Sequence, residues 1–305
     1  MLDGLWWVVS GLANGLVNLV WALFNPGAWL DWSDRESFGR FIYYGASQEM
    51  FFSLFAVVLL LTVIGLVWKP FMWGGVRGLE GFANILGRFF AYAGLIMVLQ
   101  QVMIVFLQRI FRVSSIEFGP LSIFGYNFLP GSQLFGFDLQ WWAEGLKLYN
   151  AMVIVLCVSY TYVQGGHVRV DLFYANVRFR TKRVIDALGA VFFMMPMAAI
   201  IWIYAWFFMW RHLVTPNVSA SERLDQIMRK ANVMRWNVET IGPSPGGFNA
   251  YFLFKVLIVI FALLVFLQAI AVLWRAILEW REGPEAENRY LDKDVLEQSD
   301  AVKAH

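Results

Sequence analysis

Long apolar runs separated by polar connections dominate the chain. A helix needs about 20 residues to cross the hydrocarbon core of a bilayer, and six runs are long enough. They cover residues 5–24, 50–68, 88–107, 141–163, 184–210 and 250–277. The pattern predicts an all-α fold, a polytopic membrane protein with about six transmembrane helices. Asn14 and Asn18 interrupt the first run, so a helix lying in the membrane interface is the alternative to a span there.

The connections predict how these helices are oriented. The short connection at residues 164–183 holds five Lys or Arg residues, close to the ends of two predicted spans. Positively charged connections of this kind stay in the cytoplasm. With both termini in the cytoplasm, the inner connections carry more Lys and Arg than the outer ones, so we expect that orientation.

Two segments outside the predicted spans have patterns of their own. Residues 217–240 place apolar side chains at helical spacing after a capping box of Ser219 and Glu222, which predicts an amphipathic helix. A run of Gly and Pro at 242–247 ends it. The polar residues 281–305 predict a flexible cytoplasmic tail.

Composition narrows the class of protein. Charged residues make up 15% of the chain, against about 25% in soluble domains, so a water-soluble enzyme would lack the polar residues to cover its surface. A net charge of +2 does not provide the basic surface that nucleic-acid binding needs, and we expect no nucleic-acid partner. The single cysteine, Cys157, has no intrachain partner for a disulfide.

Motifs for catalysis or cofactor binding are not found in the sequence. His167 and His212 lie at opposite ends of the fifth run and His305 lies in the tail, so no two of them can bind one haem from both sides. Nucleophile elbows, phosphate-binding glycine loops and helical zinc motifs are missing as well. We therefore expect no enzyme, no cofactor and no metal site.

Ionisable residues avoid the middle of the predicted spans. The deepest polar groups are amides, such as Gln100 and Gln268, which favour hydrogen bonds between helices over ion coordination. Proteins that conduct ions usually keep ionisable groups within their spans, so we expect this chain to support another protein. The ionisable residues that lie near span ends, where side chains can extend to water or headgroups, are Glu49, Arg88, Glu144, Lys147, Asp186, Lys255 and Arg275.

Two stripes on the predicted helices offer packing surfaces. Gly11 and Gly15, on one side with Ser10, Asn14 and Asn18, would let another helix approach closely. Packing within the chain and contact with a partner are both open for this stripe. Trp202, Trp206 and Trp210 repeat every four residues in the fifth run, where contact with lipid or core is favoured over a ligand cage.

Specific motifs lie around the fourth and fifth runs. Trp-Ala-Glu-Gly-Leu at 142–146 opens a run that ends in Gly-Gly-His-Val-Arg-Val-Asp at 165–171. A basic loop, then Lys-Arg-Val-Ile-Asp-Ala-Leu-Gly at 182–189 and Pro196, follow in order. Over about residues 85–280 the chain thus resembles the DctQ-type small membrane subunit of tripartite ATP-independent periplasmic (TRAP) transporters. It resembles the large variety of that subunit, because two more helices precede the four-helix family core.

The resemblance implies a division into three parts. These are an N-terminal two-helix extension at 1–84, the four-helix core at 85–280 with a periplasmic amphipathic insert at 211–249, and the cytoplasmic tail at 281–305. It further implies a scaffold subunit in the bacterial inner membrane, partnered with a large transport subunit, a periplasmic solute-binding protein and membrane lipids. Together they would import organic acids driven by sodium, with the substrate and sodium sites in the large subunit.

Several residues in these motifs are candidates for structural or interface roles. They are His167, Arg169, Asp171, Arg183 and Asp186, with Gly11 and Gly15 from the first run. We expect Asp171 and Asp186 to pair with the basic loop that they flank; a loop that only sets the topology is the alternative.

A second group of residues lies on the opposite side of the predicted membrane. Trp141, Trp142, Arg229 and Lys230 are expected either to rest on the membrane surface or to help dock the solute-binding protein. Two other functions stay open at this point: an autonomous small permease, and a membrane anchor subunit of a redox complex.

Overall fold

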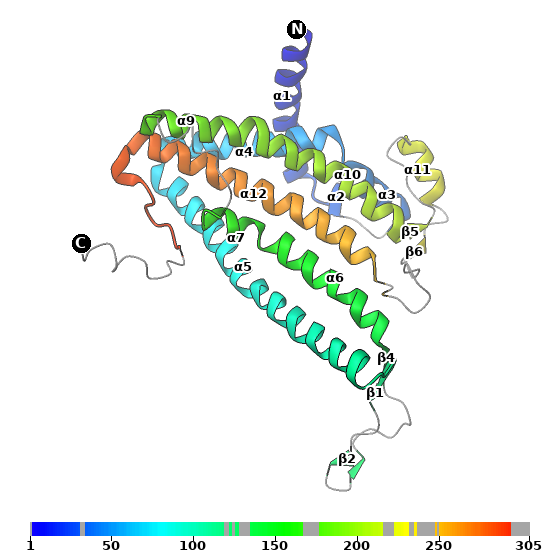
Figure 1. Cartoon of the computed structure of the whole chain (residues 1–305). Helices are drawn as coiled ribbons and strands as arrows, with labels where there is room; N and C mark the ends of the chain where they lie inside the picture. Colours follow the sequence, from blue (N-terminus) through cyan, green and yellow to red (C-terminus); the bar gives the residue numbers. More distant parts are fainter. Residues whose placement is uncertain are drawn as a thin grey trace, which may run out of the picture.

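Helices make up most of the structure (Figure 1). The computed structural model describes residues 2–30, 34–118, 122–123, 126–127, 135–166, 177–215, 223–231, 235–236, 248 and 250–293. The only strands in these ranges are two to four residues long. The prediction of an all-α fold is confirmed.

The elements follow one another with short connections. The helices are α1 (Leu2–Phe24), α2 (Gly27–Leu30), α3 (Arg35–Tyr44), α4 (Gln48–Val67), α5 (Lys69–Val105), α6 (Leu139–Leu156), α7 (Val158–Val163), α9 (Phe179–Gly189), α10 (Met195–Leu213), α11 (Leu224–Ala231) and α12 (Phe252–Glu282). One π-helical turn, Phe106–Ile110, extends α5, and another, Ala190–Met194, joins α9 to α10. The strands form antiparallel pairs: β1 (Ser115–Phe118) with β4 (Phe135–Asp138), β2 (Ser122–Ile123) with β3 (Tyr126–Asn127), and β5 (Val214–Thr215) with β6 (Arg235–Trp236).

Five helical segments are long and apolar enough to cross a membrane, which makes this a multi-pass membrane protein. They are Trp6–Phe24, Gln48–Val67, Lys69–Ile110, Phe179–Trp210 and Phe252–Glu282. The sixth predicted span, residues 141–163, corresponds to α6 and α7, which a turn at Cys157 separates. Cys157 lies at the boundary with its Sγ 3.5 Å from the carbonyl oxygen of Gly87 in α5.

One predicted connection is helical instead. Residues 69–88 were expected to form a polar link before the third span, but α5 begins at Lys69 and continues without interruption. Glycines and charged residues in this stretch weaken its apolar pattern. The buried side chains of Met72, Trp73 and Val76 nevertheless pack it against the other helices. Tertiary burial therefore decides the structure here.

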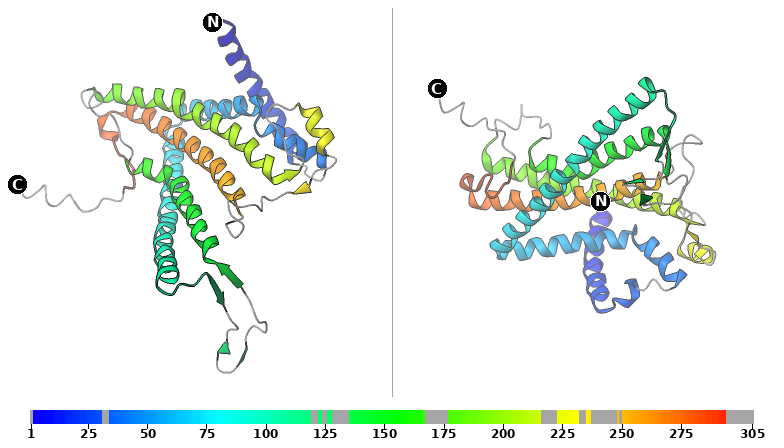
Figure 2. Two further views of the ribbon diagram at one scale, coloured as in Figure 1. Left: turned by 45° about the vertical axis from the view of Figure 1, so that its right-hand side comes forward. Right: turned by 90° about the horizontal axis from the view of Figure 1, so that it is seen from below.

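The bundle is built around α12. α10 and α9 pack along one side of α12, and α5, α6 and α7 pack along another (Figure 2). Small side chains on α12, such as Ala269, Ala271 and Ala276, are almost fully buried and let these neighbours approach closely. A Cβ on Gly87 of α5 would overlap the side chain of Tyr160 in α7, so this glycine sets the distance between those two helices.

α1 lies across the first turn of α4, and its N-terminal half projects away from the bundle (Figures 1 and 2). A Cβ on Gly11 would lie 2.8 Å from the ring of Phe52, and one on Gly15 would lie 2.7 Å from the Phe52 backbone. The glycine pair is therefore used for packing within this chain. Asn14 and Asn18 stay exposed beside it.

The tryptophans of α10 pack against α3. Trp206 is 9% exposed, and its Nε1 donates to the carbonyl oxygen of Ile42 at 2.9 Å. Trp202 Nε1 donates to the carbonyl oxygen of Gly45, also at 2.9 Å. Core contact, the favoured interpretation of these residues, is confirmed for Trp206.

Candidate functional site

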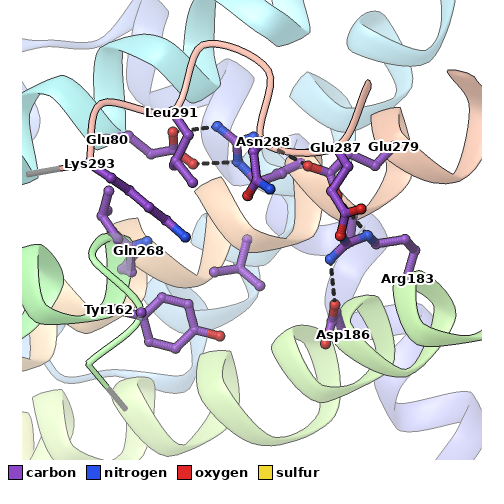
Figure 3. A pocket seen from close by; sticks show the side chains of 15 residues that line it. Glu80, Tyr162, Arg183, Asp186, Gln268, Glu279, Glu287, Asn288, Leu291 and Lys293 are labelled. Atoms are coloured by element: carbon purple, nitrogen blue, oxygen red, sulfur yellow. Dashed lines mark hydrogen bonds and ion pairs between the residues drawn. The ribbon is translucent and has the colours of Figure 1, made fainter. Parts of the chain in front are cut away.

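A polar cavity of about 390 Å³ lies at one end of the bundle. We call this end, where the first half of α5, the end of α7, the start of α9 and the end of α12 meet, the basic end. Charged side chains from α5, α9 and α12 converge on the cavity (Figure 3). It is the most polar and best-built candidate site in the described part of the chain.

Arg275 of α12 is held by two carboxylates. Its Nε lies 2.7 Å from Glu80 Oε1 and its Nη2 lies 2.6 Å from Glu80 Oε2, so it contacts both carboxylate oxygens. Its Nη1 donates to Glu279 Oε1 at 3.3 Å. The Glu80 and Arg275 side chains are only 7% and 14% exposed. Two-point contact of this kind offsets much of the cost of burying charge, and it joins α5 to α12.

Arg183 of α9 completes the network. Its Nε lies 2.7 Å from Glu279 Oε2, its Nη1 3.2 Å from Asp186 Oδ2, and its Nη2 2.9 Å from Glu287 Oε1. Glu279 thus places one oxygen on Arg183 and the other on Arg275 (Figure 3). Through this one carboxylate, α9, α12 and α5 are tied together by charge.

A glycine turn shapes the side of the cavity next to α7. Gly165 has a φ of +77°, and its N–H donates to the carbonyl oxygen of Tyr162. The N–H of Gly166 donates to the carbonyl oxygen of Thr161. This pair of bonds is a Schellman motif, which ends a helix where glycine can adopt a left-handed conformation. The two glycines of the 165–171 motif therefore terminate α7 at the cavity.

Residues 283–293, which we call the strap, fold back over the basic end. Gly283, with a φ of +91°, ends α12 and turns the chain. Asn84 Nδ2 and Gln164 Nε2 both donate to the carbonyl oxygen of Asp292, at 2.8 and 3.1 Å. The Asp292 carboxylate lies 3.0 Å from Arg88 Nη1. The expectation of a flexible tail is wrong for these residues, because side chains of the bundle bind their backbone and carboxylates.

Aromatic contacts also fix the strap. The Tyr290 ring lies 5.6 Å from the ring of Trp73 in α5, between the guanidinium groups of Arg77 and Arg289, at 5.0 and 5.1 Å. A ring between two cations is favourable on both faces. Ala286 is 2% exposed and belongs to the main apolar core.

The sequence candidates are only partly brought together here. Arg183 and Asp186 lie at the cavity and form an ion pair with each other. His167, Arg169 and Asp171 lie outside the described residues. The expected pairing is thus present for Asp186.

Glu80 and Glu279 were missed by sequence reasoning. The spacing of Arg275 and Glu279, four residues apart on one helix, was a usable signal. Glu80 pairs with Arg275 across 195 positions of sequence, and no local pattern predicts such a contact. The expectation that Arg275 and Asp186 extend toward headgroups is wrong, because both turn inward to protein partners.

Other candidates lie away from the cavity. Trp141 and Trp142 line an apolar cavity of about 490 Å³ between α5 and α6, and Gln100 Nε2 donates to the Trp142 carbonyl oxygen at 3.0 Å. Arg229 is exposed on α11 and Lys230 lies on the same helix. α11 is shorter than the predicted amphipathic helix and packs against α3. The predicted capping box, Ser219 and Glu222, is outside the described residues.

Metal ligands and known relatives were both sought. Within the described ranges, no group of three or more His, Cys, Asp or Glu side chains could hold a metal ion. Comparisons of the chain with protein-family models, with curated proteins and with solved structures gave no match.

Proposed function

We propose that this chain is the small, DctQ-type membrane subunit of a TRAP transporter, a scaffold that supports a large transport subunit. The large subunit and a periplasmic solute-binding protein would supply the sodium and substrate sites for uptake of organic acids. The site would be the bacterial inner membrane, with both termini and the basic end in the cytoplasm. The six crossings would be α1, α4, α5, the α6–α7 pair, α9–α10 and α12.

One observation carries the proposal: the membrane-crossing parts of the helices hold no ionisable residues. Residues 50–68, 89–108, 148–164, 187–210 and 256–274 contain no Asp, Glu, Lys or Arg. A protein that moves ions by itself usually keeps such groups in its spans. This supports a subunit whose ion path is carried by another chain.

The basic end supports the same role mechanically. Arg275 and Arg183 spend their donors on carboxylates of the same chain, joining α5, α9, α12 and the strap. A cross-linked end of this kind resists relative movement of the helices. A rigid support is what a moving transport subunit needs beside it.

Co-purification tests the proposal. The chain, tagged at its N-terminus, is extracted from native membranes in a mild detergent, and its partners are identified by mass spectrometry. The proposal predicts a large polytopic membrane protein in constant ratio with the chain. Recovery of redox subunits together with haem or flavin absorbance would instead show an anchor of a redox complex.

A further inference from the structure

The cavity at the basic end carries more negative than positive charge. Four carboxylates line it, from Glu80, Asp186, Glu279 and Glu287, and the guanidinium groups of Arg183 and Arg275 neutralise two of them. Two negative charges are therefore left over from these six groups. A space lined in this way favours a cation.

A lysine of the strap reaches into this space. Lys293 lines the cavity, and its ammonium group lies among the cavity residues, 3.9 Å from where a Cβ on Gly165 would be (Figure 3). No ion pair or hydrogen bond of Lys293 is described with the residues that the structure covers. Its ammonium group is thus positioned by the chain and enters the acidic space as a tethered cation.

A buried amide points to a ligand at the same place. Gln268, near the middle of α12, is 5% exposed and lines the cavity. Its side chain has no hydrogen bond with any residue in the described ranges. An amide that is buried without a partner is costly, and its oxygen can accept from an ammonium group.

We propose that this cavity is a binding site for a primary ammonium group, and that Lys293 occupies it when no ligand is bound. Gln268 accepts a hydrogen bond from the ligand, and the excess carboxylate charge holds it. The strap then acts as a tethered competitor, which leaves the cavity when an external ammonium enters.

The size of the cavity limits the ligand. A volume of about 390 Å³ exceeds what one ammonium group fills and lies in the range of small-molecule sites. A short linear diamine fits this chemistry, as does the ammonium headgroup of phosphatidylethanolamine. Both sources present the same group, and lipid composition distinguishes them.

Calorimetry on the full chain tests the site. The protein is placed in nanodiscs of phosphatidylglycerol alone and titrated with 1,4-diaminobutane. Wild type binds, and Lys293→Ala tightens binding by about tenfold, because a competitor at millimolar effective concentration is removed. Lys293→Arg keeps the wild-type affinity, since it restores a tethered cation.

Gln268→Leu supplies the second variant and Gln100→Leu its matched control. Gln268→Leu weakens diamine binding by about tenfold through the lost hydrogen bond. Gln100→Leu, which removes an amide bonded to the Trp142 carbonyl oxygen away from this cavity, leaves it unchanged. Tryptophan fluorescence during unfolding verifies that both variants are folded.

The outcomes are distinct. Weaker diamine binding in nanodiscs with phosphatidylethanolamine identifies the headgroup as the natural source, and unchanged binding identifies a soluble diamine. Absence of diamine binding in both wild type and Lys293→Ala overturns the proposal. So does binding of inorganic phosphate that Lys293→Ala abolishes, because that is an anion site. The assay uses the chain without partners, so its failure leaves the scaffold role untouched.

Discussion

Glu80 and Arg275 face each other with both carboxylate oxygens on the guanidinium group, 2.6 and 2.7 Å away, and so join α5 to α12. The two residues lie 195 positions apart. Their pairing holds the start of the longest helix against the central one. It also explains how charged residues are kept at the end of an otherwise apolar bundle.

Removing Arg275 is expected to destabilise the protein strongly. Arg275→Met leaves Glu80 and part of Glu279 as buried, unpaired charges, at a cost of about 3–5 kcal/mol in the free energy of unfolding. The double variant Glu80→Met with Arg275→Met recovers much of that loss, since no lone charge remains at this pair. Unfolding in mixed micelles, followed by tryptophan fluorescence, measures both. Arg109→Met, at an exposed position, is the control, and equal losses in the single and double variants would contradict the pairing.

Asn84 is expected to control the order of the strap. Asn84→Leu removes the donor to the Asp292 carbonyl oxygen and the acceptor for Gln164 Nε2. The strap then opens more often, and its amide hydrogens exchange several-fold faster. Hydrogen exchange with mass spectrometry reads this directly. Asn14→Leu, at an exposed position of α1, leaves the strap unchanged; if both variants behave alike, Asn84 does not hold it.

Gly87 is expected to tolerate no side chain. Gly87→Ala overlaps the Tyr160 side chain and separates α5 from α7, which costs about 1–3 kcal/mol in the free energy of unfolding. Gly81→Ala lies on the same helix with nothing within 4 Å of the new Cβ. There the better helix propensity of alanine stabilises by up to about 1 kcal/mol. Opposite signs for the two variants are predicted, and a neutral Gly87→Ala would contradict the close contact.

Much of the fold could be predicted from the sequence, because hydrocarbon imposes length and apolarity on each crossing. The runs that contain α4, α10 and α12 show this directly. The helical start of α5 could not be predicted, since Glu80 and Asn84 look like surface residues until Arg275 and Asp292 are placed beside them. The strap failed for the same reason: its order comes from side chains of α5, α7 and α12, and its own sequence is polar. At the candidate site, Arg183 and Asp186 could be selected because they are close in sequence, whereas Glu80 and Lys293 could not.

Trp206 is expected to hold α3 against α10. Trp206→Phe keeps most of the aromatic contact but leaves the Ile42 carbonyl oxygen without its donor, which costs about 1–3 kcal/mol. Hydrogen exchange in α3 rises as a result. Trp21→Phe, at a position 56% exposed on α1, gives the matched control without this effect. An unchanged exchange rate in Trp206→Phe would show that packing alone fixes α3.

The most direct test of the scaffold role is ²²Na⁺ uptake into proteoliposomes. Liposomes holding this chain alone are compared with protein-free liposomes and with the complex purified from native membranes through a tag on this chain. With its spans free of ionisable residues, the chain alone is predicted to give no uptake above the protein-free level. The native complex is predicted to take up ²²Na⁺ only when an organic acid and the solute-binding protein are added. Saturable ²²Na⁺ uptake by the chain alone would contradict the account and show an autonomous permease.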